Sequence, residues 1–93
     1  NIGANNFGFA LSQNYPNPFN PVTTILFSVP FETDIDFSIF NILGEKIRTI
    51  IKERVSVGNH QVQFDGSELI SGVYFYTLRS EAQSKTKKMH IIK

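Results

Sequence analysis

The segment Asn14–Pro21 reads N-Y-P-N-P-F-N-P and contains three of the four prolines in this 93-residue chain. Proline fixes the backbone φ angle, removes a hydrogen-bond donor and keeps the preceding residue out of the helical region. We therefore expect this segment, called the strap below, to be extended, kinked and stiff, and not to be a central strand. A solvated linker would need no large rings, so we expect Tyr15 or Phe19 to pack against the core.

On both sides of the strap, apolar and polar residues alternate in short segments, as in β-strands with one buried face. The predicted strands cover residues 23–29, 35–40, 45–51, 60–64, 73–79 and 85–92, with a short edge strand around residues 7–11. A twist or bulge is expected near Ile50. Apolar side chains lie on both faces of 73–79, so we place that strand centrally. In the last strand, Met89 and Ile91 should face inward, and Lys88 and His90 outward.

Glycines lie between the predicted strands, and Gly44, Gly58 and Gly66 are predicted to lie in turns. The segment 67–72 is too short for a stable helix, but a single helical turn capped by Ser67 could form there, with Leu69 plugged into the core. Six or seven strands with turn signals at regular intervals predict an all-β, immunoglobulin-like antiparallel β-sandwich. Residues 1–8 are expected to be a linker from an upstream cargo domain, and residues 9–93 the folded domain.

The composition suits one small folded domain, because 41% of the residues are hydrophobic and 13% are aromatic. The absence of cysteine excludes disulfides, thiol catalysis and cysteine-ligated metal. A net charge of +1 creates no field that would attract nucleic acid or an anionic membrane. No apolar run approaches the roughly 20 residues of a membrane-spanning helix. The first residue is not Met and no signal peptide is present, so we expect a piece of a longer protein.

Groups suited to catalysis are sparse. His60 and His90 stand alone in alternating strands, and both are expected on the solvent side. Ser67 and Ser71 lie near Asp65, but no histidine lies nearby in sequence to complete a triad. We therefore predict no catalytic site, no metal, no cofactor and no small-molecule substrate.

Two charged clusters leave alternatives open. Glu32, Asp34 and Asp36 could hold calcium, although a solvated face explains them more simply and the EF-hand spacing is absent. The basic residues near the end of the chain are Arg79, Lys85, Lys87, Lys88 and Lys93. Such residues beside aromatic rings can bind single-stranded nucleic acid, but lysines on a terminal strand also discourage edge pairing. We predict no nucleic-acid partner.

Several motifs follow one another from the strap to the last residue. They are N-Y-P-N-P-F-N-P from Asn14, T-T-I-L-F-S-V-P from Thr23, F-N-I-L-G-E from Phe40, G-N-H from Gly58, F-D-G from Phe64, L-I-S-G-V-Y-F-Y from Leu69, and Lys88-Met89 with Lys93 last. This ordered set, spanning about residues 9–93, resembles the type A C-terminal sorting domains of the type IX (Por) secretion system. One mild departure is Glu45-Lys46, where many members have an acidic residue or Gly-Arg.

The resemblance implies a seven-stranded immunoglobulin-like sandwich that carries no catalytic activity and sits at the C-terminus of secreted enzymes and adhesins of certain Gram-negative bacteria. It implies export through the periplasm, recognition by an outer-membrane translocon, delivery of the cargo to the cell surface or extracellular space, and removal by a sortase-like peptidase within about residues 1–10. The implied recognition residues are Asn14, Tyr15, Pro16, Asn17, Pro18, Phe19, Asn20, Pro21, Gly72, Val73, Tyr74, Lys88, Met89 and Lys93. A stiff strap and an exposed terminal strand would offer the translocon backbone edges for strand addition.

Other functions are open on the sequence alone. A structural or carbohydrate-binding immunoglobulin-like accessory module would fit, including a flagellar hook-cap-like domain, which shares the D-G…L-x-S-G-x-Y feature. A carbohydrate binder should expose an aromatic platform formed by Tyr15, Phe19, Tyr74 and Tyr76. An enzyme would need a deep polar pocket that converges on His60 or His90.

Overall fold

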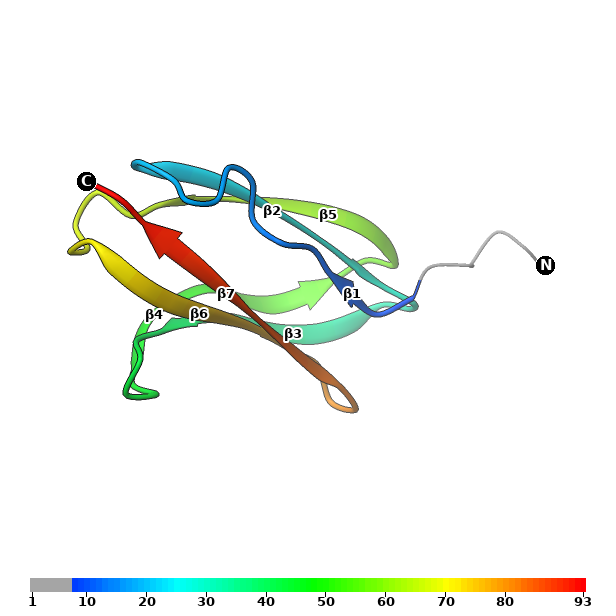
Figure 1. Ribbon diagram of the computed structural model, residues 1–93. Coiled ribbons are helices and arrows are strands. Elements are labelled where there is room, and N and C mark those ends of the chain that lie inside the picture. The colour runs from blue at the N-terminus through cyan, green and yellow to red at the C-terminus, as the bar shows by residue number, and fades with distance from the viewer. Residues whose placement is uncertain (1–7) are drawn as a thin grey trace.

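The computed structural model describes residues 8–93, which form seven β-strands packed as two antiparallel sheets (Figure 1). The strands are β1 (Ala10–Leu11), β2 (Val22–Val29), β3 (Thr33–Phe40), β4 (Lys46–Val55), β5 (Gly58–Asp65), β6 (Gly72–Arg79) and β7 (Ser84–Ile91). One sheet has the order β1-β2-β5 and the other β4-β3-β6-β7. Residues 8–93 contain no helix, and so none that could cross a membrane. The predicted immunoglobulin-like all-β sandwich is confirmed.

The expectations for residues 1–7 lie outside the described residues. These are most of the linker, the greater part of the peptidase site, and the contribution of Phe7 to the edge strand. The remainder of that edge strand is present, because β1 pairs with the end of β2 through Ala10 and Leu11.

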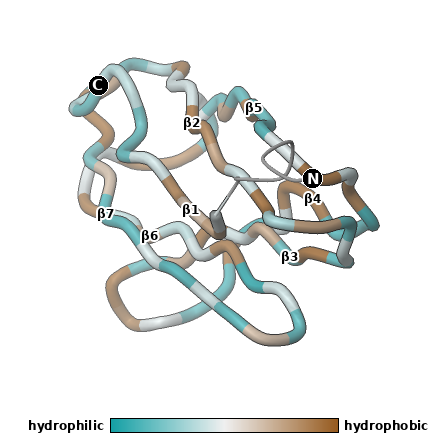
Figure 2. Tube along the Cα trace, turned by 90° about the vertical axis from the view of Figure 1, so that its right-hand side faces the viewer, coloured by the Kyte–Doolittle hydropathy of each residue, from teal (hydrophilic) through white to brown (hydrophobic). Residues whose placement is uncertain are grey.

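Side chains that alternate along the strands meet between the two sheets and form the core. Figure 2 shows the matching alternation of hydrophobic and hydrophilic residues along the chain. The ring of Phe37 stacks on that of Tyr76 and packs against Phe27, with ring centroids 5.9 Å apart in both pairs. Met89 and Ile91 are fully buried whereas Lys88 and His90 are exposed, as predicted. β6 lies between β3 and β7, which confirms the central placement of residues 73–79.

β4 is longer than predicted and continues to Val55 instead of ending at residue 51. It pairs with the whole of β3, from Thr33 opposite Val55 to Phe40 opposite Lys46. Hydrogen bonding to β3 therefore keeps residues 52–55 in the strand although most of them are polar. The pairing skips one residue at Ile50, which confirms the expected bulge, and a second at Ile47. Ile47 is exposed as a result, and Ile50 and Ile51 pack at the margin of the core.

The connection between β5 and β6 contains no helical turn, so the expectation of one capped by Ser67 is wrong. Residues 66–69 form a β-turn closed by a 2.9 Å hydrogen bond from Leu69 N to Gly66 O. The Asp65 carboxylate accepts a 2.9 Å hydrogen bond from the backbone N–H of Ser67, which lowers the pKa of Asp65. Leu69 packs against the core, as predicted.

The described chain starts and finishes at opposite ends of the sandwich (Figure 1). At the near pole, Ser28 Oγ donates a 2.7 Å hydrogen bond to Gly8 O, close to the turn between β2 and β3. The opposite end, called the far pole below, is built from residues 17–21, 41–45, 66–71 and 92–93. Residues 17–21, 66–71 and 92–93 adjoin there, because Gly72 pairs with Ile91, Ile92 N donates to Phe19 O, and Gly66 N donates to Pro21 O at 2.8 Å. The turn at residues 41–45 projects separately at the same end (Figure 1).

Candidate recognition surface

The first half of the strap is fastened to the core by two buried side chains. Tyr76 Oη donates to Ser12 O at 2.7 Å and accepts from Asn14 N at 2.8 Å. Asn14 Nδ2 in turn donates to Pro16 O at 3.1 Å and to Thr23 Oγ1 at 3.0 Å. Every buried polar side-chain atom within residues 8–93 has such a partner. Asn14 therefore acts on the path of the chain and presents no surface to a partner.

The second half of the strap buries one ring and exposes the other. Phe19 is 2% exposed and packs edge-on against Phe64, with the ring centroids 6.2 Å apart. A Cβ atom at Gly66 would lie 3.3 Å from the Phe19 ring, so glycine makes room for this packing. Tyr15 is 81% exposed. The expectation that one of the two rings reaches the core is met by Phe19.

The strap connects the two sheets through backbone hydrogen bonds. Tyr15 and Thr24 of β2 exchange two hydrogen bonds of 2.9 Å. Farther along, Phe19 N donates to His90 O and Phe19 O accepts from Ile92 N, both at 3.0 Å. The peptide bonds Tyr15–Pro16, Asn17–Pro18 and Asn20–Pro21 are cis. The strap thus joins β2 of the first sheet to the outer edge of β7 in the second.

Two side chains extend the strap along the edge of β7. Asn17 Oδ1 accepts a 3.0 Å hydrogen bond from His90 N, and Gln13 Nε2 donates to Lys88 O at 2.6 Å. The backbone edge of β7 from Lys88 to Ile92 is therefore already occupied. The expectation that the terminal strand offers a free edge is wrong for this half of β7.

The start of β6 forms a tyrosine corner, a feature of immunoglobulin-like sandwiches that fastens a strand to the preceding loop. Tyr74 is buried, and its Oη donates a 2.8 Å hydrogen bond to Ile70 O, four residues upstream. Gly72 opens the strand with a φ of 151°, which disfavours other residues, and Val73 is half-buried. Sequence reasoning missed the corner, although a tyrosine just after a loop glycine could have indicated it.

The turn between β3 and β4 holds two apolar side chains in solvent. Asn41 Oδ1 accepts hydrogen bonds from Leu43 N at 2.9 Å and from Glu45 N at 3.0 Å. Asn41 Nδ2 donates to the Glu45 carboxylate at 2.7 Å, and Gly44 completes the turn with a φ of 84°. Ile42 and Leu43 are 70% and 79% exposed on this ordered turn.

More apolar side chains lie at the same pole. Ile70 is 80% exposed and Ile92 is 48% exposed. Lys93 holds the end of the chain against the loop, because its N–H donates to Ser71 Oγ at 3.0 Å and its Nζ donates to Ser67 O. Ile42 also lines a shallow pocket with Phe75, Thr77 and Thr86. Sequence analysis included Ile42, Leu43 and Ile70 in the quoted motifs but did not predict that they are exposed, because turn residues give no periodic signal.

The predicted recognition residues separate into a buried and an exposed group. Asn14, Phe19, Tyr74 and Met89 are buried, and Gly72 and Val73 are half-buried. The exposed members are Tyr15, Pro16, Asn17, Pro18, Asn20, Pro21, Lys88 and Lys93. Of the predicted turn glycines, Gly44 and Gly66 lie in turns and Gly58 opens β5 with a φ of 117°. The exposed group can contact a partner directly, whereas the four buried side chains cannot.

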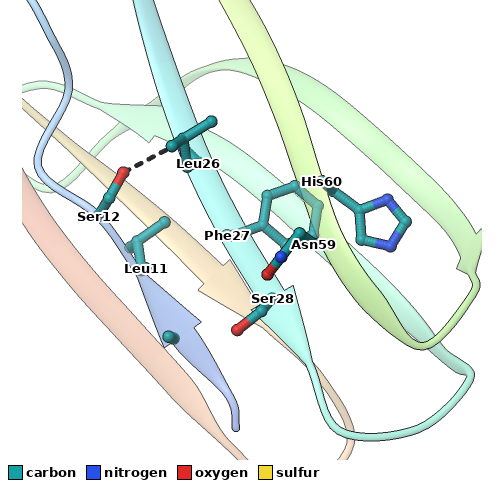
Figure 3. Close-up of a pocket in the computed structure, with 8 residues that line it drawn as sticks. Leu11, Ser12, Leu26, Phe27, Ser28, Asn59 and His60 are labelled. Carbon is teal, nitrogen blue, oxygen red and sulfur yellow. Dashed lines mark hydrogen bonds between the residues drawn. The ribbon is translucent and has the colours of Figure 1, made fainter. Parts of the chain in front are cut away.

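A shallow pocket of about 360 Å³ lies over β1, β2 and the start of β5 (Figure 3). Ser12 Oγ accepts a 2.9 Å hydrogen bond from Leu26 N at its rim. The ring of His60 stacks on Phe27 with centroids 5.1 Å apart, and its Nε2 lies 2.7 Å from Ser56 O. His60 is therefore half-buried, and the expectation that it faces solvent is wrong. Its neighbours in this pocket include no acid and no second histidine.

The acidic residues considered for calcium are engaged elsewhere. Arg54 lies 2.9 Å from the Glu32 carboxylate and 3.5 Å from that of Asp34. Asp36 accepts a 2.5 Å hydrogen bond from Ser38 Oγ, which lowers the pKa of Asp36. Within residues 8–93, no group of three or more histidine and acidic side chains could hold a metal ion.

The aromatic residues do not form a carbohydrate platform. Phe19, Tyr74 and Tyr76 are buried, which leaves Tyr15 as the exposed ring of that set. A planar binding face needs several neighbouring exposed rings, so the carbohydrate-binding alternative has no surface in this set.

Residues 8–93 define a small immunoglobulin-like β-sandwich domain. The chain belongs to the secretion system C-terminal sorting domain family, whose model matches residues 13–93. No curated protein and no solved structure matches the chain. The domain is a sorting signal of the type IX secretion system, which implies recognition by that machinery and export to the cell surface or extracellular space. Domains of this family are in general non-catalytic.

Replacing Phe19 with Ala should destabilise the domain by about 3 kcal/mol, because a buried ring is lost and a cavity remains. The free energy of unfolding from urea denaturation measures the effect. Tyr15→Ala is the matched control and should change stability by less than about 0.5 kcal/mol, since that ring is exposed. Equal effects of the two substitutions would contradict the assignment of Phe19 to the core.

Replacing Tyr76 with Phe should cost about 1–3 kcal/mol at neutral pH, because Ser12 O and Asn14 N lose their buried partner. Burial raises the pKa of Tyr76 to about 12. The unfolded chain releases this proton near pH 10, so the native state holds more protons between pH 10 and 12 and stability should fall there. Tyr76→Phe should remove part of that alkaline loss. An identical alkaline slope for the native chain and Tyr76→Phe would refute the contribution of Tyr76.

Proposed function

We propose that this domain is the non-catalytic sorting signal of an exported cargo protein. An outer-membrane translocon of the type IX secretion system reads it after passage through the periplasm, and a sortase-like peptidase then removes it. The observation that carries the proposal is the family match across residues 13–93. Residues 1–8 serve as the linker to the cargo and residues 9–93 as the sorting signal.

The far pole is the surface best placed for recognition by the translocon. The described chain begins at Gly8 on the near pole, so a cargo that precedes the domain enters it at the end opposite the far pole. A translocon that serves unrelated cargos needs a surface that the cargo does not cover or alter. The far pole meets this requirement because all of its residues belong to the sorting domain.

The proposed recognition surface combines exposed strap residues with exposed apolar side chains from two ordered loops at the same end of the sandwich. Asn20 and Pro21 come from the strap, and Ile42, Leu43 and Ile70 from the two ordered loops. Burying one such aliphatic side chain is worth on the order of 1.5–3 kcal/mol, which is enough to dominate binding when several act together. The loops are held by hydrogen bonds from Asn41 and Tyr74, so little entropy is lost on binding.

Deleting the terminal strand cannot separate recognition from folding. Met89 and Ile91 are fully buried, so loss of residues 89–93 would remove core side chains together with any signal. Substitution of exposed residues, which leaves the core intact, is the informative experiment.

A reporter fused ahead of residues 1–93 should lose at least about tenfold in surface delivery when Ile42, Leu43 and Ile70 are all replaced by Ser, since burial of three aliphatic side chains is lost. Delivery is measured in a host that possesses the secretion system, and circular dichroism checks the fold. Phe31→Ser is the matched control, because Phe31 is 60% exposed on the near pole. Undiminished delivery of the triple variant would exclude the far pole as the recognition surface.

Peptidase removal should leave the delivered reporter with a new C-terminus within about residues 1–10. Mass spectrometry of the terminal peptide locates the cut. A variant with residues 1–8 replaced by Gly and Ser should still be delivered, because the far pole is unchanged, but should be cut poorly. Recovery of a reporter that retains the intact domain would argue against removal.

A further inference from the structure

The direction of the hydrogen bonds along β2 determines which backbone groups of its neighbours are free. Thr24 exchanges two hydrogen bonds with Tyr15, and Leu26 O accepts from Ser12 N at 2.8 Å. Residues 24 and 26 therefore direct their backbone groups toward the strap and β1. In an antiparallel ladder, the backbone N–H and C=O groups of alternate residues are directed to opposite neighbouring strands. The backbone groups of Ile25 are therefore directed toward β5.

The outer edge of β5 consequently carries backbone groups that no strand of the described structure pairs. Ile25 is paired with Val62, so the even-numbered residues of β5 direct their backbone N–H and C=O groups toward β2. The N–H and C=O groups of Asn59, Gln61 and Gln63 point the opposite way, to the free edge. The C=O group of Asp65 is also directed away from β2. It accepts a 3.1 Å hydrogen bond from the side chain of Arg48, which lies outside this sheet.

This edge lacks the features that protect the other edge strands from pairing. β4 has two register shifts and the charged side chains Lys46, Lys52 and Arg54. β7 is covered by the strap at one end and carries Lys85, Lys87 and Lys88 toward the other. β1 has two residues. β5 has an unbroken register with β2 and no Asp, Glu, Lys, Arg or Pro between Gly58 and Phe64.

We propose that two copies of this domain pair through their β5 edges, antiparallel, about a two-fold axis at Gln61. Gln61 is the midpoint of the free edge, so this register uses all of it. Gln61 pairs with Gln61 of the second copy and Asn59 pairs with Gln63, each pair exchanging two backbone hydrogen bonds. The two three-stranded sheets become one continuous sheet. This interface stands independently of the sorting function.

The side chains explain why a second copy is the partner that fits. Asn59, Gln61 and Gln63 are exposed on one face of β5 and face one another across the proposed axis. Amide side chains both donate and accept hydrogen bonds, so identical neighbours are complementary. β4 and β7 instead carry several lysines and arginines, and like charges opposite one another destabilise cross-strand pairs.

The antiparallel arrangement has a geometric consequence. β5 runs from the near pole to the far pole, so the two far poles of the dimer point in opposite directions. Neither is covered by the β5 interface. A single membrane surface could contact one of them at a time.

Single cysteines test the interface and its register, because the chain contains no other cysteine. In a hydrogen-bonded antiparallel pair the Cα atoms lie about 5.5 Å apart, which a disulfide can bridge. Gln61→Cys should therefore give a covalent dimer on mild oxidation. Gln63→Cys is the matched control, because its copies would be offset by four residues, or about 13 Å. Equal cross-linking of the two variants would overturn the proposal.

Sedimentation equilibrium of the unmodified chain supplies a second test. The apparent mass should rise toward twice the monomer mass as concentration increases. Gln61→Lys places two ammonium groups opposite each other and should weaken association by about tenfold or more, whereas Gln63→Lys faces Asn59 and should weaken it far less. Circular dichroism verifies that both variants fold. A chain that stays monomeric at millimolar concentration would also overturn the proposal.

Discussion

The hydrogen bonds of Tyr76 Oη are the interaction on which the path of the chain depends. One buried hydroxyl donates to Ser12 O and accepts from Asn14 N, and so holds both sides of the point where β1 gives way to the strap. The ring beneath it stacks on Phe37 in the middle of the core. The strap can cross from one sheet to the other because its first residues are fixed to a side chain that the core itself holds in place.

Two inward-facing tyrosines of one central strand position two otherwise irregular segments. Tyr76 holds the strap, and Tyr74, two residues earlier, holds the loop between β5 and β6. Residues that meet at the far pole are thus ordered from within the sandwich. This arrangement gives the buried residues of the family motifs a structural role, which is to support the exposed residues next to them in the chain.

The strands and most of the core could be predicted from the sequence, because a period of two reports directly which face of a strand is buried. β4 was predicted too short because its last residues are polar, and only pairing with β3 extends it. His60 was placed in solvent because alternation does not show that Phe27 lies beneath its ring. The exposure of Ile42, Leu43 and Ile70 escaped prediction, because residues in turns give no periodic signal.

The strap also determines how the domain responds to a pulling force. It runs from β1 toward the far pole, and its hydrogen bonds join β2 on one side and β7 on the other. Tension applied between Gly8 and Lys93 is directed along the strands and loads the hydrogen bonds between the strap and β7 in shear, so that several must break together. Forced unfolding is governed by the unfolding rate, and shear loading of this kind keeps that rate low. The domain is thus mechanically suited to remain folded while a chain attached at the near pole is pulled.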